Sequence, residues 1–285
     1  MVKVKLCAFS DEAASSLEGQ IEALKRNNIP YMEMRGVDGK NVTALTEEEA
    51  KEIREKLDAN GIQVWSIGSP IGKSKIQDSF EEVEKLLRHT CSLANILGAD
   101  KIRMFSFFEA YDSRDEVISR LRKMVAIAKE YGVKLHHENE KDIYGDIASR
   151  VLDIMENVEG LCHIYDPANY LQVGEKAEDT QRIFAGKIDY YHVKDVIAET
   201  DQLVPAGQGD GKIGDILSSI DGEKTFTLEP HLAVFEGYSH IDKTVMKHKF
   251  TYKTSTESFD AAVAAMKDLL AKAGYQEIGD TFVKE

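Results

Sequence analysis

Cysteine is scarce in this sequence, with three residues among 285, at positions 7, 91 and 162. No two of them have the CxxC or CxxH spacing of a structural zinc site, and their odd number does not suggest a disulfide framework. We expect Cys7, Cys91 and Cys162 to be small buried residues. Long apolar runs are missing as well: no segment reaches the roughly 18 apolar residues of a membrane-spanning helix, and the N-terminus lacks the features of a signal peptide. These absences predict a soluble, cytoplasmic protein without a membrane partner.

Basic residues are too few to balance the acidic ones. The chain has 36 Lys and Arg against 50 Asp and Glu, a formal net charge of −14. Proteins that bind a phosphate backbone usually carry a basic patch or stripe, so we expect no nucleic-acid partner, although a small anionic substrate stays compatible with this charge. The sequence shows no linker, and its 42% hydrophobic content suffices for one large core. We therefore expect one domain over residues 1–285.

The sequence does contain a repeated unit, a short apolar run followed by a polar turn and an amphipathic helix, with a period of about 30 residues. The expected strands are Val4–Ser10, Tyr31–Val37, Val64–Gly68, Ile102–Phe107, Val133–Glu138, Leu161–Asp166, Ile188–Lys194 and Thr225–Glu229. The expected helices are Ser16–Asn27, Thr46–Asn60, Phe80–Leu97, Arg114–Tyr131, Asp146–Asn157, Glu178–Phe184, Gly214–Ile220 and Ser258–Ala273. This alternation predicts an α/β fold, a single (β/α)₈ TIM barrel.

A doubly wound sheet is the alternative fold. It would normally place a glycine-rich phosphate loop after the first strand, where this chain has Ser10-Asp-Glu-Ala-Ala-Ser-Ser16. Two connections are longer than the others, a glycine-rich one over Ile197–Ile213 and a polar one over Ala233–Glu257. Because active sites of barrels lie in the loops at the carboxyl ends of the strands, we expect both connections to bear on function.

Four side chains of the types that bind metals stand at the ends of the last four expected strands: Glu138, Asp166, His192 and Glu229. Three carboxylates and one imidazole suit one divalent cation, such as Mn²⁺, Mg²⁺, Co²⁺ or Zn²⁺. Side chains alternate between the faces of a strand, and this parity allows Glu138, His192 and Glu229 all to face the barrel mouth. Buried carboxylates are costly without a cation or an Arg/Lys cluster. The sequence therefore predicts a metal site.

Each of these residues alone has a more ordinary explanation. An acidic residue at a strand end is often a helix N-cap or half of an ion pair. The recurrence at four consecutive strand ends favours the metal site. Glu140 is the rival of Glu138, because it lies two residues further along the same face; we prefer Glu138 because it ends the apolar run.

The sequence resembles a known family at several motifs. The most specific are His137-Glu-Asn-Glu-Lys-Asp-Ile-Tyr-Gly145, Tyr165-Asp-Pro-Ala-Asn169, Tyr191-His-Val-Lys-Asp195, Pro205-Ala-Gly-Gln-Gly-Asp-Gly211 and Leu228-Glu-Pro230. Over nearly its whole length the chain is similar to the xylose isomerase-like barrel superfamily of sugar and sugar-phosphate isomerases and epimerases. This superfamily also includes ketose 3-epimerases, inosose dehydratases and AP endonucleases. The resemblance implies that Glu138, Asp166, His192 and Glu229 bind one divalent metal.

Two departures bear on specificity. The ketose 3-epimerases resembled here carry a His three residues after the metal-binding Asp and an Arg shortly after the metal-binding His, where this chain has Asn169 and Lys194. The particular ketose substrate is therefore not implied. The resemblance to AP endonucleases is one of fold, because those enzymes hold several zinc ions with more His ligands, and we rank DNA repair below sugar chemistry.

The resemblance implies a metal-assisted proton transfer through an enediolate, with Glu138 and Glu229 as the acid–base pair. Lys194 and His231 share faces with His192 and Glu229 and are candidates to bind substrate oxygens, as are Asn169, Arg103 and Glu33. For Lys194, His231, Arg103 and Glu33, a structural ion pair is at least an equal alternative.

Other functions stay open. One is a metal-dependent dehydratase of a cyclic polyol such as an inosose, and another is a sugar-binding barrel without catalysis. The expected partner is a small sugar or sugar phosphate. Lys212, Lys243, Lys247 and Lys249 are available to a phosphate group but are not evidently clustered. The oligomeric state is open too, although barrels of this kind often pair through loop surfaces into homo-oligomers.

Overall fold

Eight parallel strands form a closed barrel in the computed structural model, which describes residues 1–233 and 252–285. The strands are β1 (Val2–Ala8), β2 (Tyr31–Met34), β5 (Gln63–Ile67), β6 (Lys101–Met104), β7 (Lys134–Glu138), β8 (Cys162–Tyr165), β9 (Tyr190–Val193) and β12 (Glu223–Leu228). Each pairs with its neighbour in chain order, and β12 pairs with β1 to close the ring. The predicted (β/α)₈ barrel is confirmed, and the doubly wound alternative was wrong.

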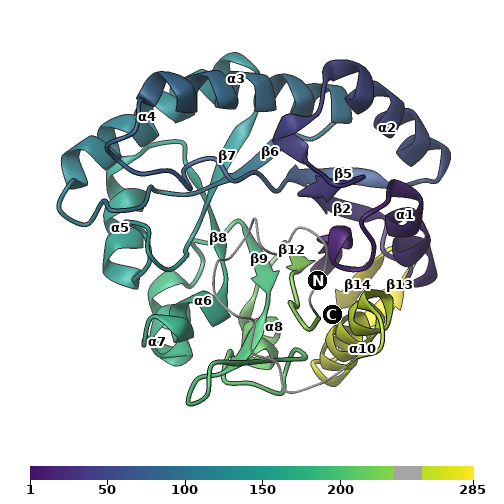
Figure 1. Ribbon diagram of the computed structural model, residues 1–285. Helices are drawn as coiled ribbons and strands as arrows, with labels where there is room; N and C mark the ends of the chain where they lie inside the picture. The colour runs from purple at the N-terminus through teal and green to yellow at the C-terminus, as the bar shows by residue number, and fades with distance from the viewer. Residues whose placement is uncertain (234–251) are drawn as a thin grey trace.

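Helices surround the strands on the outside (Figure 1). They are α1 (Leu17–Arg26), α2 (Glu47–Ala59), α3 (Phe80–Leu97), α4 (Arg114–Glu130), α5 (Ala148–Asn157), the short α6 (Pro167–Gln172), α7 (Ala177–Phe184), α8 (Ile213–Ser219) and α10 (Ser255–Lys272). Their sequences explain where they begin: Thr46 caps α2 in a capping box with Glu49. No helix in these two described stretches is long and apolar enough to cross a lipid bilayer.

Helix α3 illustrates how the helices pack onto the barrel. Its buried residues Val83, Leu87, Cys91 and Ala94 recur every three or four positions and so occupy one face of the helix. That face contacts β5 and β6, whose Val64 and Ile102 belong to the same apolar cluster. The polar residues are left for the inside of the barrel and its mouth.

The second strand is shorter than expected. Tyr31–Val37 was predicted as one strand, but β2 ends at Met34, and its register against β5 shifts between Met32 and Glu33. Gly36–Val37 (β3) then pairs with Lys40–Asn41 (β4) in a small antiparallel ribbon. Glu33 and Arg35 lie at the mouth of the barrel, where they contact His192 and Glu229.

The C-terminus adds a hairpin that the sequence did not predict. Gln276–Ile278 (β13) and Thr281–Lys284 (β14) pair with each other, and β14 pairs antiparallel with the start of β1. The hairpin brings the two chain ends together, with Val2 opposite Lys284 (Figure 1). It covers the part of β1 that precedes the β1–β2 pairing at Cys7 and Ala8.

The glycine-rich connection after β9 is organised around one carboxylate. Asp195 begins β10 (Asp195–Ile197), which pairs with β11 (Gln202–Val204), and its oxygens accept hydrogen bonds from the backbone N–H groups of Gly207, Gly209 and Gly211 at 2.8, 3.0 and 2.9 Å. A Cβ atom at Gly209 would lie 2.4 Å from Asp195 Oδ1. Glycine is therefore required because the backbone approaches the carboxylate so closely. The other long connection, Ala233–Glu257, lies mostly outside the described residues, as do Lys243, Lys247 and Lys249.

Candidate functional site

The four predicted metal ligands lie together at the carboxyl end of the barrel. Glu138 ends β7, His192 lies in β9, and Asp166 and Glu229 directly follow β8 and β12. One ligand atom from each lies within 4.8 Å of the others, and the four residues are at most 2% exposed. Parity explains three of them, since Glu138, His192 and Glu229 occupy inward positions of their strands.

His192 presents one ring nitrogen to the carboxylates and the other to the strand opposite. Its Nδ1 lies 2.8 Å from Glu138 Oε1 and 3.2 Å from Glu229 Oε2, whereas Nε2 lies 3.2 Å from Glu33 Oε2. The edge-on Phe9 ring, 5.2 Å away, limits rotation of the imidazole. Burial alone would lower the pKa of His192, but the carboxylates of Glu138 and Glu33 raise it well above its ordinary value.

Glu33 therefore lies behind His192 as its orienting partner. Its second oxygen accepts a hydrogen bond of 3.0 Å from the Tyr190 hydroxyl, which holds the carboxylate in place. Metal-binding histidines commonly donate their other ring N–H to a carboxylate, which selects the tautomer that leaves the binding nitrogen free. The sequence predicted Glu33 as a substrate-binding residue; the structure places it against the imidazole.

Asp166 both caps a helix and faces the cluster of predicted metal ligands. Its Oδ1 caps α6 by accepting hydrogen bonds from the N–H groups of Ala168 and Asn169 at 2.8 and 3.1 Å. Its Oδ2 points into the site and lies 3.0 Å from the ammonium of Lys194. Burial raises the pKa of Asp166 to about 6, although the nearby Lys194 opposes this shift.

Two buried oxygens at the centre of the site fit a cation. Among the residues that the structure describes, Asp166 Oδ2 and Glu229 Oε2 have charged neighbours but receive no hydrogen bond of good geometry. Buried polar atoms are normally satisfied, so such atoms call for an explanation. Three carboxylates and an imidazole within 4.8 Å form a donor set that suits Mn²⁺, Mg²⁺, Co²⁺ or Zn²⁺. The residues present therefore fit a divalent metal.

Two buried arginines compensate the remaining carboxylate charge. Arg103 on β6 lies 3.2 Å from Glu138 Oε2 and 3.7 Å from Glu229 Oε1, and Arg35 lies 2.9 Å from the same Glu229 oxygen. The guanidinium groups of Arg35 and Arg103 lie over the Phe9 ring, 4.4 and 4.9 Å from its centroid. Burial alone would raise the pKa of Glu138, but His192 and Arg103 hold it below its usual range. Both glutamates are thus ionised at neutral pH, since the pKa of Glu229 also lies well below its ordinary value despite burial.

The other predicted residues border the same site. Lys194 donates a hydrogen bond of 2.8 Å to Asn169 Oδ1, and the Asn169 amide donates one of 2.8 Å to the Asn139 carbonyl. His231 Nε2 lies 3.4 Å from Glu229 Oε1 and 3.3 Å from Glu12 Oε1. Glu140, the rival of Glu138, points elsewhere and pairs with Lys73 at 2.8 Å.

Sequence reasoning missed the charged residues contributed by the first two strands. Arg35 also binds Asp11, with N–O distances of 2.9 and 3.0 Å, and lies 3.3 Å from Glu12 Oε1. A signal was present, because Arg35 shares a face with Glu33 in the expected strand, and Asp11 and Glu12 follow the expected first strand, Val4–Ser10.

The Glu33 arrangement leads to a testable expectation. Replacing Glu33 with Gln should weaken Mn²⁺ binding by about 10–100-fold, because the imidazole loses the partner that orients it. Calorimetric titration of chelator-treated protein would measure the affinity, and ¹⁵N NMR would report the His192 tautomer. The matched control is Glu140→Gln, which removes a carboxylate outside the cluster. Equal Mn²⁺ affinity in the wild type and Glu33→Gln would contradict this role.

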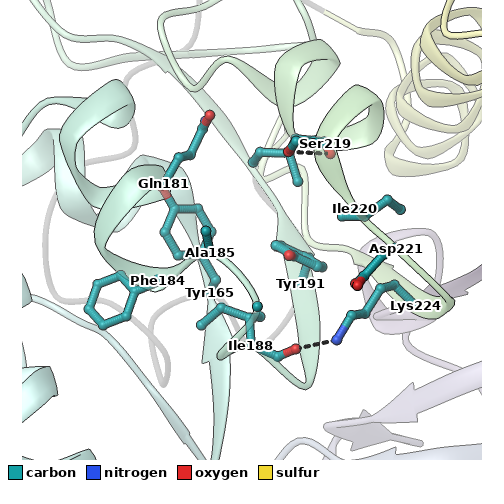
Figure 2. Close-up of a pocket in the computed structure, with 12 residues that line it drawn as sticks. Tyr165, Gln181, Phe184, Ala185, Ile188, Tyr191, Ser219, Ile220, Asp221 and Lys224 are labelled. Carbon is teal, nitrogen blue, oxygen red and sulfur yellow. Dashed lines mark hydrogen bonds between the residues drawn. The ribbon is translucent and has the colours of Figure 1, made fainter.

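A separate pocket lies on the outside of the barrel, between α7 and α8 (Figure 2). Tyr165, Phe184 and Tyr191 line it. Tyr165 and Tyr191 occupy the outward positions that alternate with Asp166 and His192. At its rim Lys224 is engaged in a hydrogen bond of 2.6 Å to the Ile188 carbonyl. This pocket is thus not part of the site at the barrel mouth.

Comparisons with known proteins agree with this architecture. The family model of the xylose isomerase-like TIM barrel matches residues 21–242. No curated protein matches the sequence. Among solved structures, the chain is similar to the IOLI protein with a bound zinc atom (16% identity, TM-score 0.73, covering 94% of this chain and 99% of that one). It is also similar to L-ribulose 3-epimerase (18% identity, TM-score 0.71, covering 96% of each chain).

A third similar structure is the probable 3-DHS dehydratase AsbF from Bacillus anthracis (16% identity, TM-score 0.69, covering 94% of this chain and 99% of that one). At these identities the solved structures show a shared fold. The family model covers well over half of the sequence, as the resemblance in the sequence motifs implied. The chain belongs to the xylose isomerase-like TIM barrel family.

Proposed function

We propose that this protein is a divalent-metal-dependent isomerase or epimerase of a sugar or sugar phosphate. The observation that carries the proposal is the convergence of Glu138, Asp166, His192 and Glu229 within 4.8 Å at the barrel mouth. Sugar epimerases among the similar structures support the substrate class. The metal would be held by these four residues through His192 Nδ1 and carboxylate oxygens. When bound, it supplies Lewis acidity that makes the C–H beside a sugar carbonyl acidic.

Glu138 and Glu229 are the proposed acid–base pair. They approach from β7 and β12, on either side of His192, at 2.8 and 3.2 Å from Nδ1. Because both are ionised, one can take the proton from the substrate carbon and yield an enediolate. The other takes up a proton from solvent and returns it to the opposite face in an epimerisation or to the neighbouring carbon in an isomerisation. General acid–base catalysis of this kind contributes about 10²–10⁴-fold to the rate.

The basic side chains around the two glutamates have separate roles in this mechanism. Lys194 lies between Asp166 and Asn169, and its ammonium can stabilise negative charge on a substrate oxygen. Arg103 contacts both glutamates, so it keeps them ionised and limits their movement. His231 provides a further donor beside Glu229. Burial of all these groups excludes water and strengthens each interaction.

A metal-dependent dehydratase is the second candidate. It is favoured by the similarity to the probable dehydratase AsbF, whose TM-score of 0.69 is close to that of the epimerase. Proton removal by the same glutamates would be followed by loss of a hydroxyl group instead of reprotonation. Lys194 or His231 would then protonate the leaving oxygen. A sugar-binding barrel without catalysis would instead predict ligand binding with no metal requirement.

Product analysis by NMR in D₂O separates these candidates. Ketoses, aldoses, their phosphates and cyclic polyols would be incubated with protein and Mn²⁺. We expect deuterium at the reacting carbon of an isomerised or epimerised sugar, and no exchange after chelation. Loss of water from the product would favour the dehydratase. Binding without exchange in every case, with metal bound, would overturn the proposed function.

A further inference from the structure

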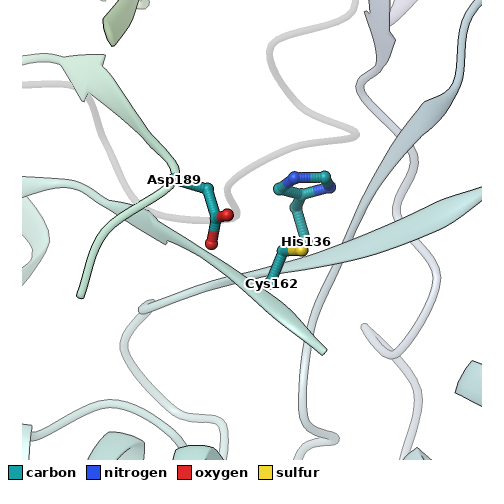
Figure 3. Close-up of side chains that lie close together, drawn as sticks. All are labelled: His136, Cys162 and Asp189. Atoms are coloured by element: carbon teal, nitrogen blue, oxygen red, sulfur yellow. The ribbon is translucent and has the colours of Figure 1, made fainter. Parts of the chain in front are cut away.

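A second cluster of metal-binding residue types lies at the opposite end of the same strands. His136 is in β7, Cys162 begins β8, and Asp189 directly precedes β9. One ligand atom from each of the three lies within 4.8 Å of the others. Figure 3 shows the Cys162 sulfur beside the His136 ring, with the Asp189 carboxylate facing them. Cys162 and Asp189 mark the amino ends of β8 and β9, so the cluster lies away from the barrel mouth.

The backbone holds these residues in a fixed arrangement. His136 and Cys162 are direct partners in the β7–β8 register. The Asp189 carboxylate accepts a hydrogen bond of 2.7 Å from the N–H of His163, and the Asp189 N–H donates one of 3.0 Å to the His163 carbonyl. One carboxylate oxygen is thereby fixed, and the carboxylate lies within reach of the Cys162 sulfur. Such prior positioning reduces the entropy lost when a ligand binds.

The imidazole supplies the second, independent observation. His136 is only 2% exposed, and within the described part of the chain its Nδ1 makes no hydrogen bond of good geometry. The ring is held in place by contact with Tyr190, at 5.3 Å between ring centroids. A buried nitrogen without a well-formed hydrogen bond is costly. A cation bound by this group would remove the cost.

We propose that His136, Cys162 and Asp189 form a second metal site, selective for a thiolate-binding divalent cation such as Zn²⁺, Co²⁺ or Cd²⁺. Thiolate and imidazole ligands favour these ions over Mn²⁺ and Mg²⁺, which prefer the oxygen-rich site at the mouth. Binding breaks the Cys162 S–H bond and forms an S–metal bond, and the proton leaves to solvent. Cys162 is half-buried and Asp189 is exposed, so the cation has a route in and a solvent molecule completes its coordination.

The site has a structural consequence. It joins the middle of β7 to the amino ends of β8 and β9, and the same strands lead to Glu138, Asp166 and His192 at the barrel mouth. A cation bound there stabilises the folded protein, because the unfolded chain does not bring the three ligands together. Cys162 was expected to be a buried small residue, but it is only half-buried. Cys7 and Cys91 are buried as expected.

Cobalt spectroscopy tests this proposal without relying on enzyme activity. The full chain, treated with a chelator, would be saturated with Mn²⁺ at the mouth and then titrated with Co²⁺. A sulfur-to-cobalt charge-transfer band in the near ultraviolet is the expected signature. Cys162→Ser should abolish the band, and Asp189→Asn should weaken the Co²⁺ affinity that produces it by at least about tenfold. The amide oxygen introduced by Asp189→Asn can still accept the hydrogen bond from His163, and the exposed position tolerates the change.

Two controls keep the result specific. Cys91→Ala removes a buried cysteine outside the cluster and should leave the band unchanged, with circular dichroism showing that every variant is folded. Glu138→Gln alters only the mouth and should also retain the band. Absence of the band in the wild type at saturating Co²⁺, or its persistence in Cys162→Ser, would overturn the second site.

Discussion

Replacing Glu138 with glutamine is expected to lower the rate of proton exchange by about 10²–10⁴-fold. Glutamine has the same shape but neither accepts the substrate proton nor supplies a charged ligand beside His192 Nδ1, which lies 2.8 Å from Glu138. The measurement is deuterium incorporation from D₂O into the substrate identified by screening, with the bound metal quantified on the same samples. The exchange rate and the amount of bound metal should fall together, because the proposal makes Glu138 both a base and a metal ligand.

Glu140→Gln is the matched control for that experiment. It makes the same chemical change two residues further along the strand direction, where the carboxylate pairs with Lys73 instead of the ligand cluster. Near wild-type exchange is expected for this variant. A loss of exchange and metal in Glu140→Gln, with Glu138→Gln unaffected, would reverse the assignment of the ligand on β7.

Replacing Arg35 with methionine is expected to destabilise the metal-free protein by about 3–5 kcal/mol, the usual cost of removing one partner from a buried ion pair. The Arg35 side chain is 3% exposed and contacts Asp11, Glu12 and Glu229, which would be left without this compensating charge. Urea unfolding at neutral pH would measure the change. Arg26→Met is the control: its pair with Asp260 is 43% and 38% exposed, so the change should cost about 1 kcal/mol or less.

The destabilisation should depend on pH in a defined direction. Burial would raise the pKa of Glu229, but His192, His231 and Lys194 hold it well below its ordinary value. Its charged contacts, the 2.9 Å pair with Arg35 among them, therefore contribute stability that is present above the unfolded-state pKa and is lost as pH falls through the folded-state value. The difference between the wild type and Arg35→Met should therefore be largest near neutral pH and shrink in acid. A difference that is constant down to acidic pH would show that Arg35 acts through packing alone.

The barrel and its ligand-bearing strands were predictable because both follow from local patterns. Each apolar run of β-type residues was followed by a helical pattern, several of them with capping signals, and this alternation leaves few other folds. Parity along β7, β9 and β12 then placed Glu138, His192 and Glu229 on inward positions. Asp166 was placed by the end of its apolar run at Pro167, which the structure explains as the start of α6.

Features that depend on tertiary contacts were not predictable in the same way. Parity places Glu33 inside the barrel but does not say that it faces the imidazole of His192 instead of a substrate. Arg35 lay in the expected strand, but its pairing with Asp11 and Glu229 joins segments that are distant in the sequence. The C-terminal hairpin forms on an edge of β1 that is free only because β2 pairs late along β1. The three glycines after β9 were attributed to a functional loop, whereas their N–H groups surround Asp195.

The central claim is that Glu138, Asp166, His192 and Glu229 hold one divalent metal. Calorimetric titration of chelator-treated protein with Mn²⁺ tests it most directly, because this ion favours the oxygen-rich set at the mouth. Asp166→Asn is the most informative variant, since the introduced amide can still cap α6 through its side-chain oxygen while the charge facing the site is lost. We predict one Mn²⁺ site per wild-type chain and its loss in Asp166→Asn. Absence of Mn²⁺ binding by the wild type, or undiminished binding by this variant, would contradict the account.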